Sequence, residues 1–324
     1  MKRTVLFIIL SGILLLSACG KKEEIAGTEF YREDVIGPMT SGVGVNGRIA
    51  PVSEGLAVIL SEDIYDPDYV AVPTSLLIRE NTHDVLYSKG ALNKIYPASM
   101  TKCMTALLAI EYFGDLDTPV TAGDEVYEGI SDSSSLAGIT PGMTFTVKDL
   151  LTALLLPSGN DAANVLAAAV SGSVTEFVAL MNARAKELGM INTRFANPNG
   201  LHDANHYTTA YDLYLLMRAC MEKQAFREAA GLSEGSITGN LPDGSQTTLS
   251  FKSTNSYARG FTIPPEGVRY LYSKTGYTEQ AGRCIISVFE DTKKNTYIAV
   301  SAGAKTYDEL YLETNALLAI IGQD

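Results

Sequence analysis

A serine and a lysine stand three positions apart in the stretch Pro97-Ala98-Ser99-Met100-Thr101-Lys102. An apolar run follows, and Pro97 suits the start of a helix. Helical residues at i and i+3 share a face with Cβ atoms about 5–6 Å apart, so the Lys102 amine can reach the Ser99 hydroxyl. A serine becomes a nucleophile when an adjacent base takes its proton, and a lysine with a lowered pKa is such a base. The alternative is that Ser99 caps a helix and Lys102 is solvated.

Two further motifs carry chemistry that matches this pair. Ser158-Gly159-Asn160 offers a hydroxyl that can relay a proton and an amide that can orient a lysine and a substrate. Lys274-Thr275-Gly276 offers an ammonium and a hydroxyl for a substrate carboxylate, and its glycine lets a ligand lie close to a strand. Ser-x-x-Lys and Lys-Thr-Gly each occur once, whereas Ser-x-Asn occurs again at Ser253-Thr254-Asn255. We expect Ser158 to act, because a tight turn between two buried helices fixes its side chains.

Strand patterns lie at both ends of the region that carries these motifs. Thr74–Arg79 and Asp84–Ser88 predict a hairpin, and three later segments predict further strands: 268–274, 283–289 and 296–301. Between them, apolar periodicity and capping residues predict helices at Ser99 and after Thr146, Pro157, Ser173 and Thr209. Residues 237–244 look rich in turns. A final amphipathic helix is expected to pack on the core; the alternative, a membrane-surface helix, would need a basic polar face that this one lacks. The economical topology is one sheet built from both ends, with a helical insertion between them.

The amino terminus has the pattern of an export signal. Lys2 and Arg3 precede an apolar run from Val5 to Leu16, which is short for a membrane-spanning helix. Leu16-Ser17-Ala18-Cys19-Gly20 resembles a bacterial lipobox, which implies cleavage before Cys19 and a lipid on that cysteine. We therefore expect a signal peptide over 1–18, a lipidated terminus and flexible linker over 19–55, and one domain over 56–324. An ordinary signal peptide with a chance cysteine is the alternative.

Composition and the positions of cysteine and histidine argue against two classes of function, nucleic-acid binding and metal binding. Of 324 residues, 46% are hydrophobic, and the formal charge of −12 argues against a nucleic-acid partner. Cys103, Cys220 and Cys284 are far apart without metal-ligand spacing, which favours small buried side chains and leaves a disulfide open. His202 and His206 lack an evident third ligand, so local loop structure is the better interpretation. We expect no metal and no cofactor.

The order Ser-x-x-Lys, Ser-x-Asn, Lys-Thr-Gly is that of class A β-lactamases and penicillin-binding proteins. The chain resembles the serine-type D-Ala-D-Ala carboxypeptidases, which are low-molecular-weight penicillin-binding proteins of the peptidase S11 family. The likeness runs from about residue 74 to 305 and includes the stretches 98–102, 156–162, 188–201, 206–210 and 274–278. It implies an α/β fold of the α+β type, similar to β-lactamases and transpeptidases, with an antiparallel sheet flanked by helices and an all-helical lobe inserted.

The resemblance also implies how bond cleavage would proceed. Ser99 would attack the carbonyl between the two terminal D-alanines of a peptidoglycan stem peptide, and Lys102 would take the serine proton. Ser158 would pass a proton toward the departing D-alanine, and Asn160 would orient the site. Water would then release the acyl group from Ser99. β-Lactam antibiotics are the expected inhibitors, and the enzyme would face the cell wall outside the membrane.

The same resemblance assigns substrate binding to the last motif, Lys274-Thr275-Gly276. Lys274 and Thr275 would bind the terminal carboxylate beside Gly276. The backbone N–H groups of Ser99 and Tyr277 would form the oxyanion hole. The family often has histidine where this chain has Tyr277. A backbone N–H survives that change, but pH dependence and substrate preference are left open.

Three other functions fit parts of the sequence. A β-lactamase needs an acid that activates the deacylating water, usually in a Glu-x-x-Leu-Asn pattern, and the stretch 187–192 does not match it. Gly231-Leu232-Ser233-Glu234-Gly235 matches the nucleophile motif of an α/β-hydrolase, but a helix is expected before it, where that motif needs a strand. A non-catalytic lipoprotein that binds stem peptides stays open, although such a site has no chemical need for every motif residue.

Overall fold

The structure is a computed structural model that describes residues 56–59, 70–130 and 134–323. The predicted signal peptide, Cys19 and the predicted linker lie outside these residues. All elements named below belong to one compact unit, Gly47–Asp324.

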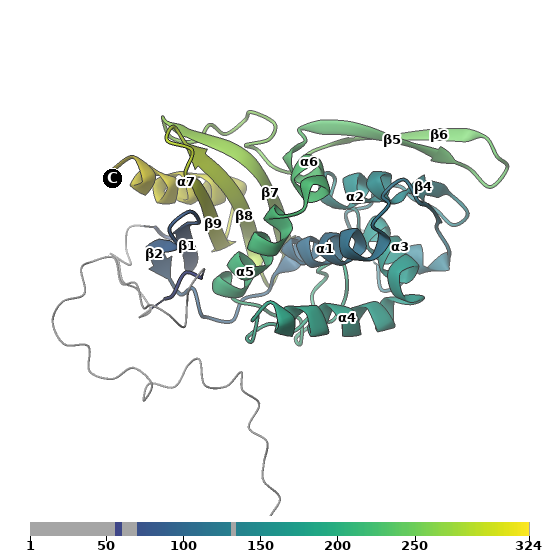
Figure 1. Cartoon of the computed structure of the whole chain (residues 1–324), viewed down its shortest axis with the longest axis horizontal. Helices are drawn as coiled ribbons and strands as arrows, with labels where there is room; N and C mark the ends of the chain where they lie inside the picture. The colour runs from purple at the N-terminus through teal and green to yellow at the C-terminus, as the bar shows by residue number, and fades with distance from the viewer. Residues whose placement is uncertain (1–55, 60–69, 131–133, 324) are drawn as a thin grey trace, which may run out of the picture. The chain divides into compact units, whose positions relative to one another are not determined.

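Five antiparallel strands form the main sheet, in the order β2-β1-β9-β8-β7 (Figure 1). The amino-terminal hairpin supplies β1 (Thr74–Arg79) and β2 (Asp84–Lys89). The carboxyl-terminal region supplies β7 (Val268–Thr278), β8 (Gly282–Asp291) and β9 (Thr296–Ala304). Since β9 pairs with both β1 and β8, the prediction of one sheet built from both ends is confirmed. Each of the three later strands extends beyond its predicted bounds.

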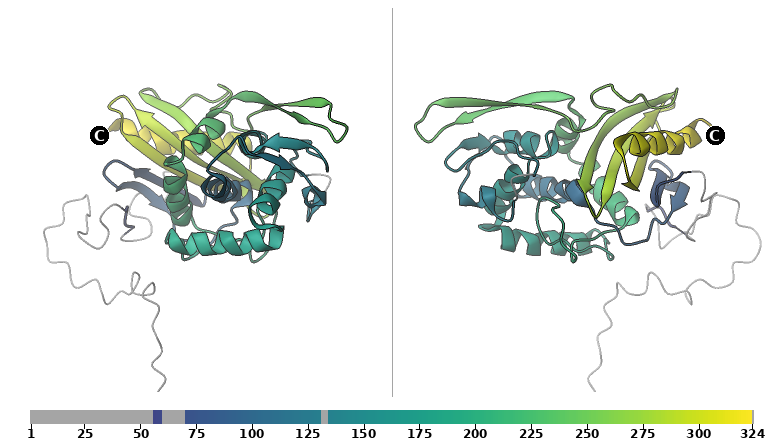
Figure 2. Two further views of the ribbon diagram at one scale, coloured as in Figure 1. Left: turned by 45° about the vertical axis from the view of Figure 1, so that its right-hand side comes forward. Right: turned by 180° about the vertical axis from the view of Figure 1, so that it is seen from behind.

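The two faces of this sheet bury different hydrophobic clusters, as the alternation of strand side chains requires. Leu76 and Ile286 belong to the cluster shared with the helical region. Their neighbours Leu77 and Ile285 pack instead with residues of α7 (Tyr307–Leu318). Figure 2 shows α7 lying along one face of the sheet, so the predicted packing of the last helix on the core is confirmed.

Six helices form the region between the two groups of strands: α1 (Lys102–Phe113), α2 (Val147–Leu155), α3 (Asn160–Ser171), α4 (Val174–Glu187), α5 (Ala210–Met221) and α6 (Gln224–Gly231). The central helix α1 contacts each of the other five, so its first turn is held from several sides. Thr146 and Asp149 form the predicted capping box of α2, and hydroxyls cap α4 and α5 at Ser173 and Thr209. No single helix of the described ranges is long and apolar enough to span a membrane; α3 and α4 pass that test only as a pair bent by 83°.

A second, four-stranded sheet was not expected. It has the order β3-β4-β5-β6 and comprises β3 (Pro119–Thr121), β4 (Thr144–Thr146), β5 (Glu234–Asn240) and β6 (Gln246–Lys252). The interpretation of 237–244 as turn-rich was wrong over β5. This strand is built of glutamate, glycine, serine, threonine and asparagine around one well-buried apolar residue, Ile237, so it lacks an apolar alternation. Because the 231–235 stretch runs from the last residue of helix α6 into strand β5, it has the reverse of the strand-then-helix order of a hydrolase elbow.

Candidate active site

Ser99 lies in a short 3₁₀ helix, Ala98–Thr101, that leads directly into α1. Its Oγ is 2.9 Å from the Nζ of Lys102, so the two residues meet as their spacing predicts. Lys102 is fully buried, whereas Ser99 keeps part of its surface exposed. Ala98 has φ of +46°, in the left-handed region that residues other than glycine rarely adopt. The surrounding structure must therefore hold this strained turn, which presents the hydroxyl.

The surroundings of Lys102 favour its neutral form. Nζ lies 2.6 Å from both Asn160 Oδ1 and the carbonyl oxygen of Asn199. A neutral amine has two hydrogens and one lone pair, so it can donate to these two oxygens and accept from the Ser99 hydroxyl. Burial lowers the pKa of Lys102 well below 10.5, and the charge of Lys274 lowers it further. All three partners of the amine are uncharged groups.

The turn between α2 and α3 supplies Ser158 and Asn160. Ser158 has φ of +66°, so this side chain too is held on a strained backbone. Its Oγ accepts a hydrogen bond of 2.9 Å from Lys274 Nζ. The next residue, Asp161, fixes the adjacent loop, because its carboxylate accepts the N–H groups of residues 137, 138 and 139. Ser158 and Asn160 thus join two buried lysines within one connected group.

The competing Ser253-Thr254-Asn255 motif has a different role in the fold. Asn255 accepts a hydrogen bond from the hydroxyl of Tyr311, in α7, and also contacts Ser273. The middle residue, Thr254, places its hydroxyl 2.6 Å from that of Thr275. Sequence reasoning assigned no role to Thr254, and its position inside a repeated motif was the only feature that could have indicated one.

Lys274 and Thr275 lie near the end of β7. Lys274 is fully buried, and burial lowers its pKa to about 8. Besides Ser158, its Nζ donates to the carbonyl oxygen of Thr275 at 2.9 Å. The lysine is therefore mostly charged at neutral pH and stands beside the hydroxyl of Ser158.

Two glycines let other segments approach the turn that carries Ser99. A Cβ on Gly276 would lie 3.0 Å from the backbone nitrogen of Ser99 and 3.1 Å from the carbonyl oxygen of Pro97. Gly200 has φ of +92°, and a Cβ there would lie 1.9 Å from the carbonyl oxygen of Ala98. The absence of these side chains allows β7 and the loop after Asn199 to pack directly on the turn that carries Ser99.

His206 hydrogen-bonds to the turn that carries Ser99. Its Nδ1 accepts the N–H of Ala196 at 3.2 Å, so Nε2 carries the hydrogen and donates to Thr101 Oγ1 at 2.8 Å. Burial lowers the pKa of His206 to about 4. His202 instead packs edge-on against Tyr96. In the part of the chain that the structure describes, no three histidine, cysteine or acidic side chains gather as metal ligands.

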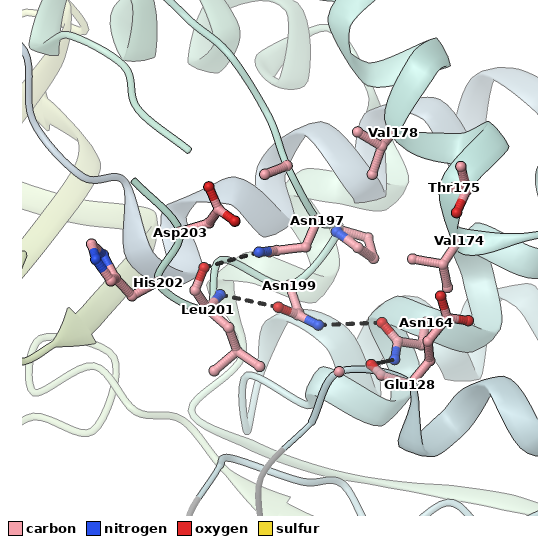
Figure 3. A pocket seen from close by; sticks show the side chains of 13 residues that line it. Glu128, Asn164, Val174, Thr175, Val178, Asn197, Asn199, Leu201, His202 and Asp203 are labelled. Atoms are coloured by element: carbon pink, nitrogen blue, oxygen red, sulfur yellow. Dashed lines mark hydrogen bonds between the residues drawn. The ribbon is translucent and has the colours of Figure 1, made fainter. Parts of the chain in front are cut away.

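A cavity of about 340 Å³ is lined by Asn199, whose carbonyl oxygen binds Lys102, but Lys102 itself does not line it. Its walls come from α3, α4 and the segment 196–203, as Figure 3 shows. A chain of hydrogen bonds runs along it, because Asn199 donates to Asn164, which in turn donates to the carbonyl oxygen of Glu128. The side chain of Asn199 thus faces this cavity while its carbonyl oxygen binds Lys102. Sequence reasoning missed this role, since a backbone carbonyl leaves no mark in a motif.

The three cysteines of the described residues are all free and buried. This answers the question left open by the sequence, because no disulfide joins Cys103, Cys220 and Cys284. Burial raises the pKa of Cys103 to about 12 and that of Cys284 to about 11. Their thiols act as small core side chains.

Comparisons with known proteins identify the family of this chain. A family model described as Peptidase_S11, D-alanyl-D-alanine carboxypeptidase, matches residues 62–306. The chain belongs to the peptidase S11 family. It is 34% identical over 251 residues to D-alanyl-D-alanine carboxypeptidase DacF of Bacillus subtilis, covering 76% of this chain and 60% of that protein. It is 31% identical over 221 residues to a D-alanyl-D-alanine endopeptidase of Pseudomonas aeruginosa, covering 67% of this chain and 66% of that one.

The fold can also be compared with solved structures. The crystal structure of the Streptomyces K15 DD-transpeptidase matches with a TM-score of 0.73 at 25% identity, over 79% of this chain and 98% of that one. The predicted fold class, an antiparallel sheet with helices and a helical region, is therefore confirmed. This S11 chain spans less than two thirds of the length of the curated relatives that it matches first, 60% and 62%.

Proposed function

We propose that this S11 protein is a serine-type D-Ala-D-Ala carboxypeptidase that removes the terminal D-alanine of peptidoglycan stem peptides. The observation that carries the proposal is the buried amine of Lys102, 2.9 Å from the Ser99 hydroxyl and bound otherwise to two neutral oxygens. An uncharged lysine in this position can accept the serine proton as the oxygen attacks. Membership of the S11 family supplies the substrate class.

In the acylation step, Ser99 Oγ bonds to the carbonyl carbon of the penultimate D-alanine while its proton moves to Lys102. The C–N bond to the last D-alanine then breaks, and its nitrogen must gain a proton. Ser158 is suited to relay to this nitrogen the proton that Lys102 took, which leaves Lys102 neutral for the next step. The charged Lys274, which donates to Ser158 Oγ, keeps its own proton. The products of this step are an ester on Ser99 and free D-alanine.

The oxyanion that forms on the way needs donors at fixed positions. We assign this role to the N–H groups of Ser99 and Tyr277, since Gly276 brings β7 against the backbone of Ser99. Removing one such donor typically costs about 2.7–4 kcal/mol of transition-state stabilisation. Water then attacks the ester, with Lys102 as its base, and the serine is restored.

Two measurements on the full chain test the proposal. Fluorescent penicillin should label the wild type covalently and lastingly, and should not label Ser99→Ala. The matched control is Ser253→Ala, which alters the serine of the competing motif and should keep labelling. Rapid turnover of the drug would indicate a β-lactamase, and no label on the wild type would indicate a non-catalytic binding protein.

Release of D-alanine from a peptide that ends in D-Ala-D-Ala is the second measurement. We expect release from the wild type and none from Ser99→Ala. Covalent labelling without release would contradict carboxypeptidase activity. Cross-linked peptides would then test the endopeptidase activity that one relative carries in its name.

We also propose that a lipid on Cys19 tethers the enzyme to the outer face of the bacterial membrane, next to its wall substrate. The support is the sequence alone: a short charged start, an apolar run and the stretch Leu16-Ser17-Ala18-Cys19-Gly20. An alkyne fatty acid fed to cells should label the wild type and leave Cys19→Ala unlabelled. Labelling of both proteins would refute the anchor.

A further inference from the structure

The guanidinium of Arg283 lies between two tyrosine rings beside the end of β7. Its central carbon is 4.4 Å from the centre of the Tyr277 ring and 3.6 Å from that of the Tyr307 ring. Tyr277 directly follows the Lys274-Thr275-Gly276 motif, and Tyr307 is the first residue of α7. Aromatic faces attract a cation at such distances, so the two rings hold this charge next to the proposed substrate strand.

The strand register places Arg283 on the same face as the substrate-binding threonine. Arg283 pairs with Tyr277 across β7 and β8, and Thr275 pairs with Ile285. Since strand side chains alternate, Thr275, Tyr277 and Arg283 share one face of the sheet. Diagonal neighbours across two strands are about 7–8 Å apart, which a long arginine side chain can cover. The guanidinium is thus within reach of a ligand on the Thr275 hydroxyl.

Arg283 also differs from most other arginines of the structure in its partners. Four of them form ion pairs with carboxylates: Arg79, Arg184, Arg218 and Arg269. Within the described residues Arg283 has no such pair, and its buried Nε has no hydrogen-bond partner. The chain has a net charge of −12, yet the Arg283 guanidinium forms no ion pair with a carboxylate of the described residues. It is therefore free to bind an anionic ligand.

We propose that Arg283 binds the terminal carboxylate of the substrate, together with Thr275. The planar guanidinium can donate two parallel hydrogen bonds to a carboxylate, while the two tyrosines limit its orientation. Tyr277 then has two roles, one through its backbone N–H and one through its ring. This inference rests on the proposed function and adds a residue that selects substrates with a free carboxylate.

The test uses two thioester substrates whose leaving groups differ only in ending as a carboxylate or a carboxamide. We expect Arg283→Gln in the full chain to lower kcat/KM for the carboxylate substrate by about 10- to 100-fold, the usual range for a lost charge-assisted contact. Its effect on the carboxamide substrate should be at most about twofold. Arg283→Lys should recover part of the difference, because it restores charge without the planar fork.

The matched control is Arg259→Gln. The Arg259 guanidinium also stacks on an aromatic ring, 4.3 Å from the centre of Phe261, and this ring belongs to neither β7 nor α7. It should leave both rates unchanged. An equal loss on both substrates with a lower melting temperature would show that Arg283 only packs between the tyrosines. Unchanged carboxylate kinetics in Arg283→Gln would refute the inference alone, whereas an inactive, penicillin-insensitive wild type would refute the proposed function and the inference with it.

Discussion

In the proposed mechanism, two buried lysines with unequal pKa values set the pH range of acylation. Burial and the charge of Lys274 hold the pKa of Lys102 well below 10.5, and burial lowers that of Lys274 to about 8. The base must be neutral and Lys274 must be charged, so the rate should rise as Lys102 loses its proton and fall above about pH 8. Rates of penicillin acylation between about pH 5 and pH 10 check this.

Lys274→Arg separates the two limbs of that profile. Arginine stays charged over the whole range, so the fall at high pH should disappear while the rise at low pH remains. A wild-type profile without the alkaline fall would contradict the role given to Lys274, and so would a fall that persists in the variant.

At this scale, sequence reasoning reached the groups that carry their chemistry in side chains. Ser99, Lys102, Ser158 and Lys274 could be predicted because three motifs follow one another in a known order, although Ser-x-Asn by itself occurs twice. The Asn199 carbonyl could not, since every residue offers the same acceptor. Thr254 was missed for a different reason: its contact with Thr275 depends on where a loop returns to the sheet.

The approach of β7 to the nucleophile depends on one glycine. We expect Gly276→Ala to lower the acylation rate by at least about tenfold, because a small displacement of reacting groups is enough for a loss of this size. The added Cβ would meet backbone atoms of Ser99 and Pro97, which can give way only if the strand or the turn moves. Time courses of fluorescent penicillin labelling measure the effect.

Gly235→Ala is the control for that change. It lies in β5 and its Cβ would meet a leucine side chain at 3.4 Å, an ordinary contact. This variant should acylate as the wild type does. A similar loss in both variants would mean that general strand disruption, and not the contact with Ser99, is responsible.

His206, which hydrogen-bonds to Thr101 in the turn that carries Ser99, links that turn to stability. The pKa of His206 is about 4 in the folded chain against 6.5 when free, so the unfolded state binds more protons between these values. Stability is therefore lost as the pH falls through that window, by about 2 kcal/mol between pH 7.5 and pH 5 from this residue.

His206→Gln should remove this contribution while keeping a donor for Thr101. Urea unfolding at the two pH values, compared between wild type and variant, measures it. If both proteins lose the same stability on acidification, His206 is not buried in its neutral form.

The elements themselves were predictable where apolar periodicity is strong. The hairpin of β1 and β2, the capped helix α2 and the terminal helix α7 agree with expectation. β5 was not recognised, because its pairing with β6 and its single buried isoleucine stabilise a strand whose composition is that of a turn. Tertiary context decided this element, as it does for many strands.

Taken as a whole, the folded unit protects all three of its described thiols. Cys103, Cys220 and Cys284 are buried and free, and burial raises their pKa values. Iodoacetamide should therefore react with them only after the molecule unfolds, and a reducing agent should not change the melting temperature. Mass spectrometry of alkylated native and urea-treated protein checks this. Fast alkylation of the native protein would contradict it.

The position of β9 has a consequence for how the protein is made. Among the strands of the described residues β9 comes last in the sequence, yet it lies between β1 and β8. A hairpin such as β1–β2 is marginal without a neighbour, so a chain still lacking residues 296–304 cannot close its sheet behind Lys274. Chains that end before residue 296 should thus form no covalent penicillin adduct, so drug labelling would count only the molecules that contain β9.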